Sequence, residues 1–361
     1  MKDEKNSKLK TQNSKLIRPL YLSPTGRGGV DFGIQNIVRS VRRYGAPQAE
    51  LLQLPELYNF APMLIQRSLP SSWHQGFDVI QGRSRVGFAL RVPGKALVTT
   101  VHHLTTDPAL QPYSSFQQRL FYRLVESRYD GWSIRDADAV VCVSRYTQRQ
   151  VEQRYGRRDT VLIYDGMDSE VFVPTPGMQR REDGLPHSDA RIRLLFIGNR
   201  TRRKGFDLLP HIMDLLPEDY VLFYNGGFQN TGALPQHPRM VNIGTPDRDG
   251  LVAAYQSCDI MLFPSRLEGF GIAPAEALLC GRPVVTTNIA ALPEVVDHDL
   301  NGLLCPRDDV AAYAQAVRTL GEDTAMRHRF GEHGRDKILR CFGYDQLGQG
   351  FVALYERILG K

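Results

Sequence analysis

Hydrophobic and polar positions along this chain follow two alternating periods. Short apolar runs of strand length are separated by stretches in which apolar residues recur at helical spacing, as Ile34, Ile37, Val38 and Val41 do. The strand-like runs, in chain order, are RPLYLS, ALVTTV, DAVVCV, TVLIY, RLLFIG, YVLFY, MVNIG, DIMLFP and PVVTT. Strands that alternate with helices predict an α/β fold built on doubly wound parallel sheets.

A segment rich in proline, glycine and charge interrupts this pattern. The segment, VPTPGMQRREDGLPHSDA, spans residues 173–190 and has the composition of a linker. A chain of 361 residues is too long for one ordinary core, so we predict two Rossmann-like domains that face a central cleft. The predicted parts are a disordered tail at 1–15, an N-terminal domain at 16–175, a linker at 176–190, and a C-terminal domain at 191–361 whose last helix, about 345–361, packs back on the N-terminal domain.

Composition excludes several classes of protein. The longest apolar runs are far shorter than the ~20 residues that a membrane helix needs, and the first fifteen residues lack the apolar stretch of a secretory signal. The five cysteines include no CxxC pair, so neither a disulfide framework nor a zinc site is predicted. We expect a cytosolic protein with no nucleic-acid partner.

Charge is distributed unevenly along the chain. Residues 1–175 carry 24 Lys+Arg against 16 Asp+Glu, whereas the remainder carries 21 against 23, which indicates that the two halves face different partners. Six arginines on two predicted N-terminal helices could contact anionic lipid headgroups, or could simply be solvated. They are Arg39, Arg42, Arg43, Arg119, Arg123 and Arg128.

Two glutamates flank a glycine-broken turn in LEGFGIAPAEALLCGRP, residues 267–283, directly after a strand-like run. If a helix begins near Pro274, its first amides point at an anion, at the positive end of the helix dipole. These amides belong to Gly271, Ile272 and Ala273. Glu276 could accept hydrogen bonds from vicinal hydroxyls, and Glu268 would face whatever is attached beyond the anion. Alternatively, Glu276 is only an exposed helix residue and Glu268 a loop charge.

A basic turn, GNRTRRKGFD, follows the first strand of the predicted C-terminal domain. Its cations could neutralise a diphosphate, or could be solvated. They are Arg200, Arg202, Arg203 and Lys204. The turn is not a Walker loop, because lysine precedes glycine here.

Three further motifs lie in the N-terminal half. The turn TGRGG lacks the last glycine of GxGxxG, where Asp31 stands, so it is either a tight turn or a place where a phosphate or sugar approaches the backbone. His102 and His103 directly follow the run ALVTTV, a position where a histidine either reaches a sugar or packs in the core. Asp136 and Asp138 form a DAD that is best interpreted as the turn before a buried strand, and no catalytic metal is predicted.

Taken in order, these segments resemble the retaining family 4 glycosyltransferases of the GT-B fold. The resemblance runs from about residue 18 over nearly the whole chain. It is carried by the GRGG turn, VHHL, VSRYT, IYDGMD, FIGNRTRRKG, LFPSRLEGFGIAPAEAL and ALPEVV. The most specific feature is the glutamate pair inside EGFG…EA.

The resemblance implies a role for each motif residue. Glu276 would bind the ribose hydroxyls of the nucleotide, Glu268 the transferred sugar, and His102 the sugar near its reacting carbon. Lys204 and either Arg200 or Arg203 would hold the diphosphate. The backbone of Phe270, Gly271 and Ile272 would bind it too, beside the turn of Gly28 and Gly29. This chain departs from the family pattern at Asn199, His103 and Asp165, where arginine, aspartate and asparagine are usual.

The implied activity is retaining transfer of a hexose-type sugar from a UDP- or GDP-sugar, without cofactor or metal. The acceptor would be a saccharide or lipid-linked saccharide, bound by the N-terminal domain, in the synthesis of cell-envelope polysaccharide or lipopolysaccharide. The N-terminal domain would sit peripherally on the inner face of the cytoplasmic membrane. A GT-B epimerase and a non-catalytic nucleotide-sugar binding module remain alternatives.

Overall fold

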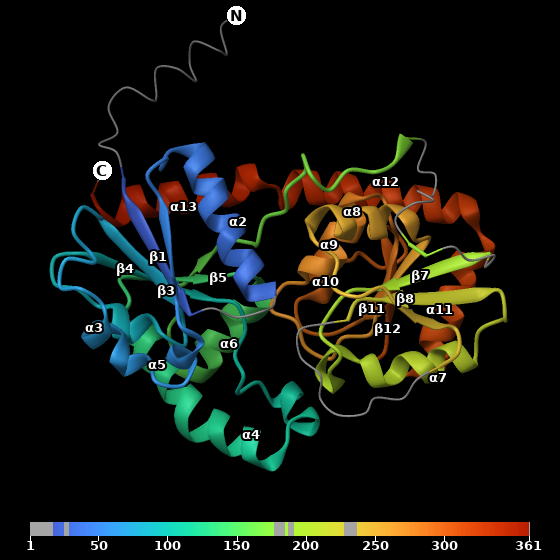
Figure 1. The fold of residues 1–361 in the computed structure, drawn as a ribbon, viewed down its shortest axis with the longest axis horizontal. Helices are drawn as coiled ribbons and strands as arrows, with labels where there is room; N and C mark the ends of the chain where they lie inside the picture. Colours follow the sequence, from blue (N-terminus) through green and yellow to red (C-terminus); the bar gives the residue numbers. More distant parts are fainter. Residues whose placement is uncertain (1–16, 25–28, 177–184, 187–190, 227–236, 361) are drawn as a thin grey trace, which may run out of the picture. The chain divides into compact units, whose positions relative to one another are not determined.

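The computed structural model describes residues 17–24, 29–176, 185–186, 191–226 and 237–360. The predicted tail and most of the predicted linker lie outside these residues. The chain divides into two compact units (Figure 1). Unit 1 comprises Met1–Thr106, Gln117–Gly166 and Tyr344–Lys361, and unit 2 comprises Asp107–Phe116 and Met167–Gly343.

Unit 1 is built on a six-stranded parallel sheet with the order β2-β1-β3-β4-β5-β6. Its first strand thus lies inside the sheet, which is the arrangement of a doubly wound fold. The strands are β1 (Pro19–Pro24), β2 (Glu50–Leu54), β3 (Val79–Arg83), β4 (Ala96–Val101), β5 (Ala139–Cys142) and β6 (Val161–Leu162).

Helices cover both faces of the unit 1 sheet. Alternate strand residues point to opposite sides, so neighbouring residues of one strand pack in different cores. Val98 of β4 packs in one core, with α2 (Gly29–Tyr44) and α13 (Tyr344–Ile358). Its neighbour Leu97 packs in a second core, which contains residues of the helical elements on the other side. These elements are α3 (Ile65–Ser68), η3 (Gly87–Leu90), α5 (Ser127–Asp136) and α6 (Arg145–Tyr155). Three further elements of the chain here are η1 (Glu56–Asn59), η2 (Pro62–Leu64) and α4 (Phe116–Phe121), which runs into a π-helical turn, η5 (Tyr122–Glu126).

Unit 2 has a second six-stranded parallel sheet, with the order β12-β11-β10-β7-β8-β9. The strand order reverses between β7 and β10, so the carboxyl ends of these two strands form the topological switch point. The strands are β7 (Ile192–Phe196), β8 (Tyr220–Tyr224), β9 (Met240–Asn242), β10 (Ile260–Phe263), β11 (Val284–Thr287) and β12 (Gly302–Cys305).

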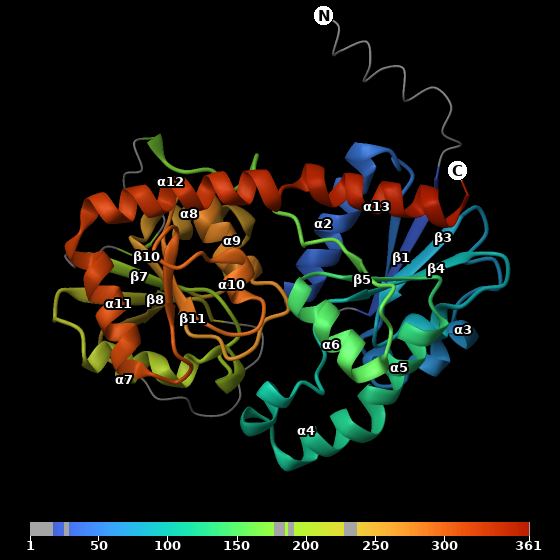
Figure 2. The same ribbon diagram turned by 180° about the vertical axis from the view of Figure 1, so that it is seen from behind.

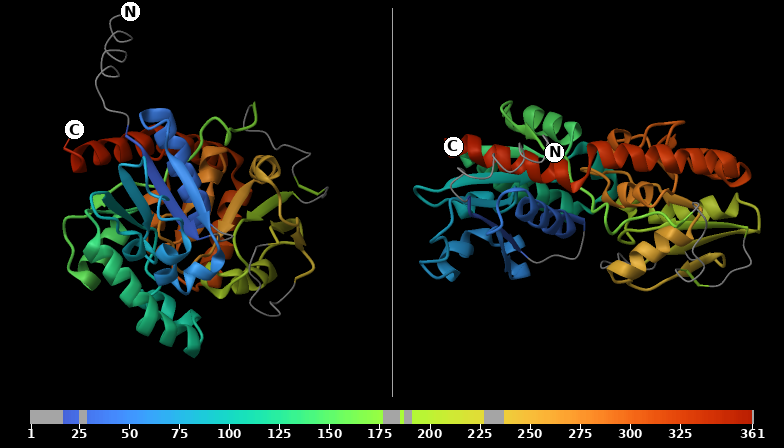
Figure 3. Two further views of the ribbon diagram at one scale, coloured as in Figure 1. Left: turned by 60° about the vertical axis from the view of Figure 1, so that its left-hand side comes forward. Right: turned by 90° about the horizontal axis from the view of Figure 1, so that it is seen from above.

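The helices of unit 2 lie on both sides of its own sheet (Figures 2 and 3). They bury β10 and β11 completely, which explains why these strands are continuous apolar runs without alternation. The helices are α7 (Leu209–Asp214), α8 (Arg248–Ser257), α9 (Ile272–Leu279), α10 (Leu292–Val295), α11 (Val310–Glu322) and α12 (Thr324–Cys341). Short turns η4 (Pro108–Tyr113), η7 (Arg202–Lys204) and η8 (Phe206–Leu208) complete the unit.

The predicted fold class, with two doubly wound parallel sheets, is confirmed. The predicted start of α9 is also confirmed, since the helix begins at Ile272 and Pro274 lies in its first turn. Three short strands that the hydrophobic pattern does not predict, β2, β3 and β12, complete the sheets. Asp138 of the DAD motif precedes β5, and its carboxylate accepts a hydrogen bond from the Leu97 amide at 2.7 Å. It therefore has the structural role that was expected. Within the described residues, none of the helices combines the length and apolar character that a bilayer crossing requires.

Candidate functional site

The two constellations of unit 2 lie at its topological switch point. Strand β7 ends at Phe196 and leads into the basic turn, and β10 ends at Phe263 and leads into the glutamate turn. Loops at the carboxyl ends of adjacent parallel strands meet at one edge of the sheet. The structure therefore brings together two segments that are about 60 residues apart in the chain.

Lys204 and Glu268 form a largely buried ion pair between these loops. The Lys204 Nζ lies 2.6 Å from Glu268 Oε1, which also accepts a hydrogen bond of 2.6 Å from the Ser265 hydroxyl. Burial lowers the pKa of Lys204, an effect that the Glu268 carboxylate partly offsets. Burial alone would raise the pKa of Glu268, but the nearby cations, Lys204 first, hold it below its ordinary value.

Backbone contacts fix the basic turn against the glutamate turn. The Arg266 amide donates to the Arg203 carbonyl at 2.8 Å, and the Arg203 guanidinium donates to the Leu267 carbonyl at 3.0 Å. Gly205 has φ +70°, and a Cβ there would lie 2.0 Å from the Pro264 carbonyl oxygen. Only glycine allows this approach, so the turn is held in one place.

The glutamate turn leads into α9 through Gly271, whose φ of +117° again favours glycine. The Phe270 side chain is buried, with its ring centroid 5.2 Å from that of Phe342, so only the Phe270 backbone can face a ligand. The first amides of an α-helix have no partner within the helix. The amides of Ile272 and Ala273 are in this position at the start of α9, where the sequence predicts an anion site.

Glu276 lies one turn into α9 and is half-buried. Its Oε2 accepts a hydrogen bond of 3.0 Å from the Tyr255 hydroxyl. Burial raises the pKa of Glu276 to about 8, against smaller opposing effects of Tyr255 and the Arg248 charge. Burial therefore favours the neutral form of this carboxyl group in the ligand-free protein.

His102 lies in unit 1, directly after β4, and is only 7% exposed. Its Nδ1 is 3.8 Å from Asp165 Oδ2, and its Nε2 has no hydrogen-bond partner among the described residues. A Cβ at Gly33 would lie 3.3 Å from the imidazole, so the backbone of α2 packs closely on it. The histidine also lines a cavity of about 10 Å³, together with Gln81 and other residues. Such a volume holds about one water molecule.

The remaining predicted residues divide between the units. Gly28 lies outside the described residues, and Gly29 is the first residue of α2 in unit 1. Arg200 lies half-buried in the segment between β7 and η7 of unit 2. The structure thus groups Arg203, Lys204 and Glu268 in unit 2, and His102 with Asp165 in unit 1.

Three residues at these sites are absent from the sequence-based prediction. Tyr255 lies on a buried helix face and looks like a core residue in the sequence, so no local signal marks its contact with Glu276. Ser265 and Arg266 stand beside Glu268, and their proximity to it was the only available signal. Within the described parts of the chain, no three His, Cys, Asp or Glu side chains are grouped so that they could hold a metal ion.

Two family models match the chain and together span most of it. Residues 16–171 match the model described as Glycosyltransferase Family 4, and residues 179–337 match the model described as Glycosyl transferases group 1. A curated relative in Rhizobium meliloti, the lipopolysaccharide core biosynthesis mannosyltransferase LpsB, is 26% identical over 66% of this chain and 72% of its own length. Other curated relatives match over 52% to 89% of their own length, so the chain spans little more than half of some of them.

Solved structures match the fold over almost the whole chain. Sucrose-phosphate synthase from Thermosynechococcus elongatus superposes with a TM-score of 0.82 at 19% identity, covering 95% of this chain and 99% of that one. Anabaena Alr3699/HepE in complex with UDP-glucose superposes with a TM-score of 0.78 at 19% identity, covering 94% and 100%. At such identities the likeness concerns the fold alone.

Proposed function

Because the chain belongs to glycosyltransferase family 4, whose members are nucleotide-sugar glycosyltransferases of the GT-B fold, we propose that it is a retaining hexosyltransferase. The donor is a UDP- or GDP-sugar, and the acceptor is a saccharide or lipid-linked saccharide. The observation that carries this proposal is the Lys204–Glu268 ion pair, which lies at the switch point of unit 2 beside the start of α9.

The diphosphate of the donor binds to the basic turn and to the first amides of α9. Lys204 and a guanidinium from Arg203 or Arg200 supply the positive charge, and the backbone of Phe270, Gly271 and Ile272 supplies donors. Preorganised cations and a helix N-terminus stabilise the negative charge that develops on a departing nucleoside diphosphate. The fixed backbone of the turn supports this role, since donors held in place need little reorganisation during the reaction.

The two glutamates bind opposite ends of the same donor. Glu276 accepts hydrogen bonds from the ribose hydroxyls, and Glu268 orients the transferred sugar. The Lys204 ammonium, which pairs with Glu268, also interacts with the diphosphate. The ion pair supports this assignment, because it places the sugar-binding carboxylate next to the cation of the leaving group. The carboxylates are therefore not a general acid and base pair.

Retention follows here from a front-face displacement. The leaving diphosphate oxygen accepts the proton of the acceptor hydroxyl while the new bond to the anomeric carbon forms on the same face. His102 is assigned to the sugar near that carbon, and its Nε2, which has no hydrogen-bond partner among the described residues, is the atom available for this contact. No metal and no cofactor take part in this proposal.

The acceptor binds to the N-terminal domain, which meets the membrane from the cytoplasmic side. Exposed apolar side chains on η1, η2, the α4 region and α5 support this location, together with the exposed basic residues Arg119, Arg123 and Arg128. The exposed apolar residues of unit 1 in and beside these elements are Leu57, Phe60, Met63, Leu64, Leu120, Leu124 and Trp132. The rings of Phe60 and Phe121 lie 6.2 Å apart, so η1 and α4 are neighbours. Apolar groups beside arginines favour an anionic membrane surface.

This location has its own test. The protein should float with liposomes that contain phosphatidylglycerol and should stay behind with pure phosphatidylcholine. The double variant Leu120→Glu/Leu124→Glu should lose flotation, whereas Arg39→Glu on α2 should change it less. Equal flotation with both lipids would contradict the proposal.

The function is tested by screening UDP-, GDP- and dTDP-sugars for thermal stabilisation, then by following each binder with NMR. We expect one donor to raise the melting temperature and to be hydrolysed slowly, with release of the α-configured sugar from an α-linked donor. Formation of an epimerised nucleotide sugar would instead favour an epimerase. Binding without hydrolysis or transfer would favour a non-catalytic binding module.

The lipopolysaccharide core mannosyltransferase among the relatives makes GDP-mannose the first donor to test, and the UDP-glucose complex of the Anabaena protein makes UDP-glucose the second.

A further inference from the structure

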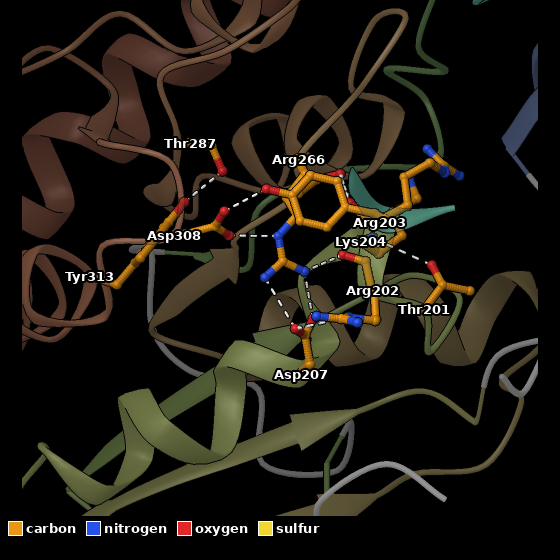
Figure 4. A network of polar contacts seen from close by, with 11 residues as sticks. Thr201, Arg202, Arg203, Lys204, Asp207, Arg266, Thr287, Asp308 and Tyr313 are labelled. Atoms are coloured by element: carbon orange, nitrogen blue, oxygen red, sulfur yellow. Dashed lines mark hydrogen bonds and ion pairs between the residues drawn. The ribbon is translucent and has the colours of Figure 1, made fainter. Parts of the chain in front are cut away.

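Arg266 belongs to the glutamate turn between β10 and α9, and its side chain, which reaches the basic turn, is only 4% exposed. Its guanidinium forms a bidentate contact with Asp207, at 2.6 and 3.1 Å, and donates through Nε to Asp308 at 2.6 Å. Its Nη1 also donates to the Arg202 carbonyl. Figure 4 shows the guanidinium between the two carboxylates, which together offset its buried charge.

An aromatic ring covers this guanidinium. The Arg266 Cζ lies 4.4 Å from the ring centroid of Tyr113, whose hydroxyl donates to Asp308 Oδ2 at 2.5 Å. Tyr113 ends η4, in the segment Asp107–Phe116 that belongs to unit 2 although its sequence neighbours belong to unit 1. Stacking on an aromatic face and bidentate binding of a carboxylate are properties that lysine does not share with arginine.

These contacts hold the basic turn on both sides of Lys204. The side chain of Arg266 fixes the Arg202 carbonyl before Lys204 and the Asp207 carboxylate after it. Arg266 itself stands two residues before Glu268 in the chain, and its main-chain amide fixes the Arg203 carbonyl. One arginine thus determines where both members of the Lys204–Glu268 pair lie, without being exposed to a ligand itself.

We propose that Arg266 is a positioning residue for the donor diphosphate, and that Tyr113 keeps its guanidinium in place. The proposal rests on the proposed function of the same site. With Arg266 in place, the Lys204 ammonium lies where the second phosphate of the donor binds. Without it the turn 202–207 loosens, and the ammonium is averaged over several positions. A catalytic cation displaced by about 1 Å is expected to cost a large factor in rate.

Arg193 offers a matched control. It is also 4% exposed, donates to the Pro186 carbonyl at 2.9 Å, and lies 5.1 Å from the ring centroid of Phe223. It stands near the start of β7, at the opposite end of the strand from the basic turn. Arg193→Lys should therefore destabilise unit 2 without moving Lys204.

The experiment compares Arg266→Lys with Arg193→Lys, using UDP, UMP, GDP and GMP as probes. For the base that the wild type binds, we expect Arg266→Lys to reduce the ratio of diphosphate to monophosphate affinity about tenfold, because only the second phosphate needs the positioned ammonium. Monophosphate affinity should stay within about twofold. The kcat for donor hydrolysis should fall by about 30-fold, and Arg193→Lys should keep both the ratio and kcat. Tyr113→Phe, which keeps the ring but loses the hydroxyl, should reduce the ratio by two- to threefold.

An unchanged ratio in Arg266→Lys, with loss of thermal stability equal to that of Arg193→Lys, would show that Arg266 only stabilises the fold. If Arg266→Lys does not fold, Tyr113→Phe decides, and a wild-type ratio in that variant overturns the proposal. Failure of the proposed function would look different, because the wild type itself would then bind no nucleoside diphosphate and hydrolyse no nucleotide sugar.

Discussion

Units 1 and 2 each bury a polar pair after a parallel strand, but the two pairs are satisfied differently. In unit 2, Lys204 and Glu268 are in direct contact, and Ser265 adds a further hydrogen bond. In unit 1, His102 and Asp165 are 3.8 Å apart, and each has a buried atom without a hydrogen-bond partner in the described part of the chain. Buried polar groups without partners are costly, so they indicate a site that a ligand or water completes.

The difference separates two kinds of residue. The unit 2 pair is complete before a donor arrives, and removing one member leaves a buried charge unpaired. The unit 1 histidine contributes little through hydrogen bonds to the free protein, because its Nε2 forms none with the residues that the structure describes. Substitutions in the unit 2 pair should therefore affect stability and activity together, whereas substitutions at His102 should affect activity much more than stability.

The largest effect is expected from Glu268→Gln. The substitution removes the carboxylate that pairs with Lys204 and that we propose orients the sugar, so kcat should fall about 1,000-fold, within the range of losses known for preorganised electrostatic groups. Stability should fall by about 3 kcal/mol in urea unfolding, since a buried ammonium loses its partner. Affinity for the nucleoside diphosphate should be kept or increased, because Lys204 is released toward it. Reduced diphosphate affinity would contradict the assignment of Glu268 to the sugar.

His102→Asn is the corresponding test in unit 1. The variant keeps a polar side chain but removes the imidazole nitrogen that we propose contacts the sugar, so kcat should fall about 100-fold. The urea midpoint should fall less than in Glu268→Gln, because the variant loses some packing volume but no hydrogen bond of Nε2 to the described residues. A stability loss as large as that of Glu268→Gln would show that His102 is a packing residue.

Glu276 provides a pH-dependent prediction. Its folded-state pKa of about 8 lies above the ordinary value of 4.5, so the folded protein binds more protons than the unfolded chain between these values. The associated stability is fully present below about pH 4.5 and is lost as pH rises through about 8. Glu276→Gln, which stays neutral, should therefore melt higher than the wild type at pH 9, and the difference should vanish near pH 4.5. Parallel melting curves at both pH values would contradict the raised pKa.

Donor affinity should show the opposite dependence on pH. A ribose whose hydroxyls donate to Glu276 needs the ionised carboxylate, so wild-type affinity should rise by up to about tenfold per pH unit below pH 8 and then level off. Glu276→Gln should bind more weakly and without this slope. Titration calorimetry of the nucleoside diphosphate at pH 6, 7, 8 and 9 measures the affinity of the wild type and of Glu276→Gln and how each depends on pH.

The smallest effect is expected from Asp165→Asn. This substitution introduces the residue that the family pattern has there, and the charge it removes lies 3.8 Å from the imidazole without a hydrogen bond. We expect kcat to change by less than fivefold, with no loss of donor affinity. A change as large as that of His102→Asn would show that the two residues act as one unit.

The sequence predicted the parts of this molecule that depend on local pattern. The long apolar runs gave the central strands, because strands buried on both faces leave no room for polar residues. Strands β2 and β3 were missed because polar residues interrupt them, as in ELLQL and VIQGR, and β2 is half-exposed. Strand β12, GLLC, was missed because its initial glycine leaves an apolar run of only three residues. Pro274 correctly indicated the start of α9, because proline is tolerated in the first turn of a helix, and Gly271 turns the chain into that helix through its positive φ.

The candidate site was predicted only as far as its residues are neighbours in sequence. The glutamates and Lys204 stand in recognisable motifs, but the partners that set their properties come from distant segments. Tyr255 is 21 residues from Glu276, and the contact of Tyr113 with Asp308 joins residues 195 positions apart. Such contacts depend on which strands are adjacent, and a single sequence does not reveal this.

The central claim is that the basic turn of unit 2 holds the diphosphate of a nucleotide sugar through Lys204. Lys337 gives a matched control, since its Nζ lies 2.9 Å from Asp297 and its side chain is 15% exposed, against 16% for Lys204. The most direct measurement is titration calorimetry of the selected nucleoside diphosphate with wild type, Lys204→Ala and Lys337→Ala. We predict that Lys204→Ala weakens binding at least 100-fold while Lys337→Ala binds as the wild type does. Equal affinities in all three proteins would contradict the account.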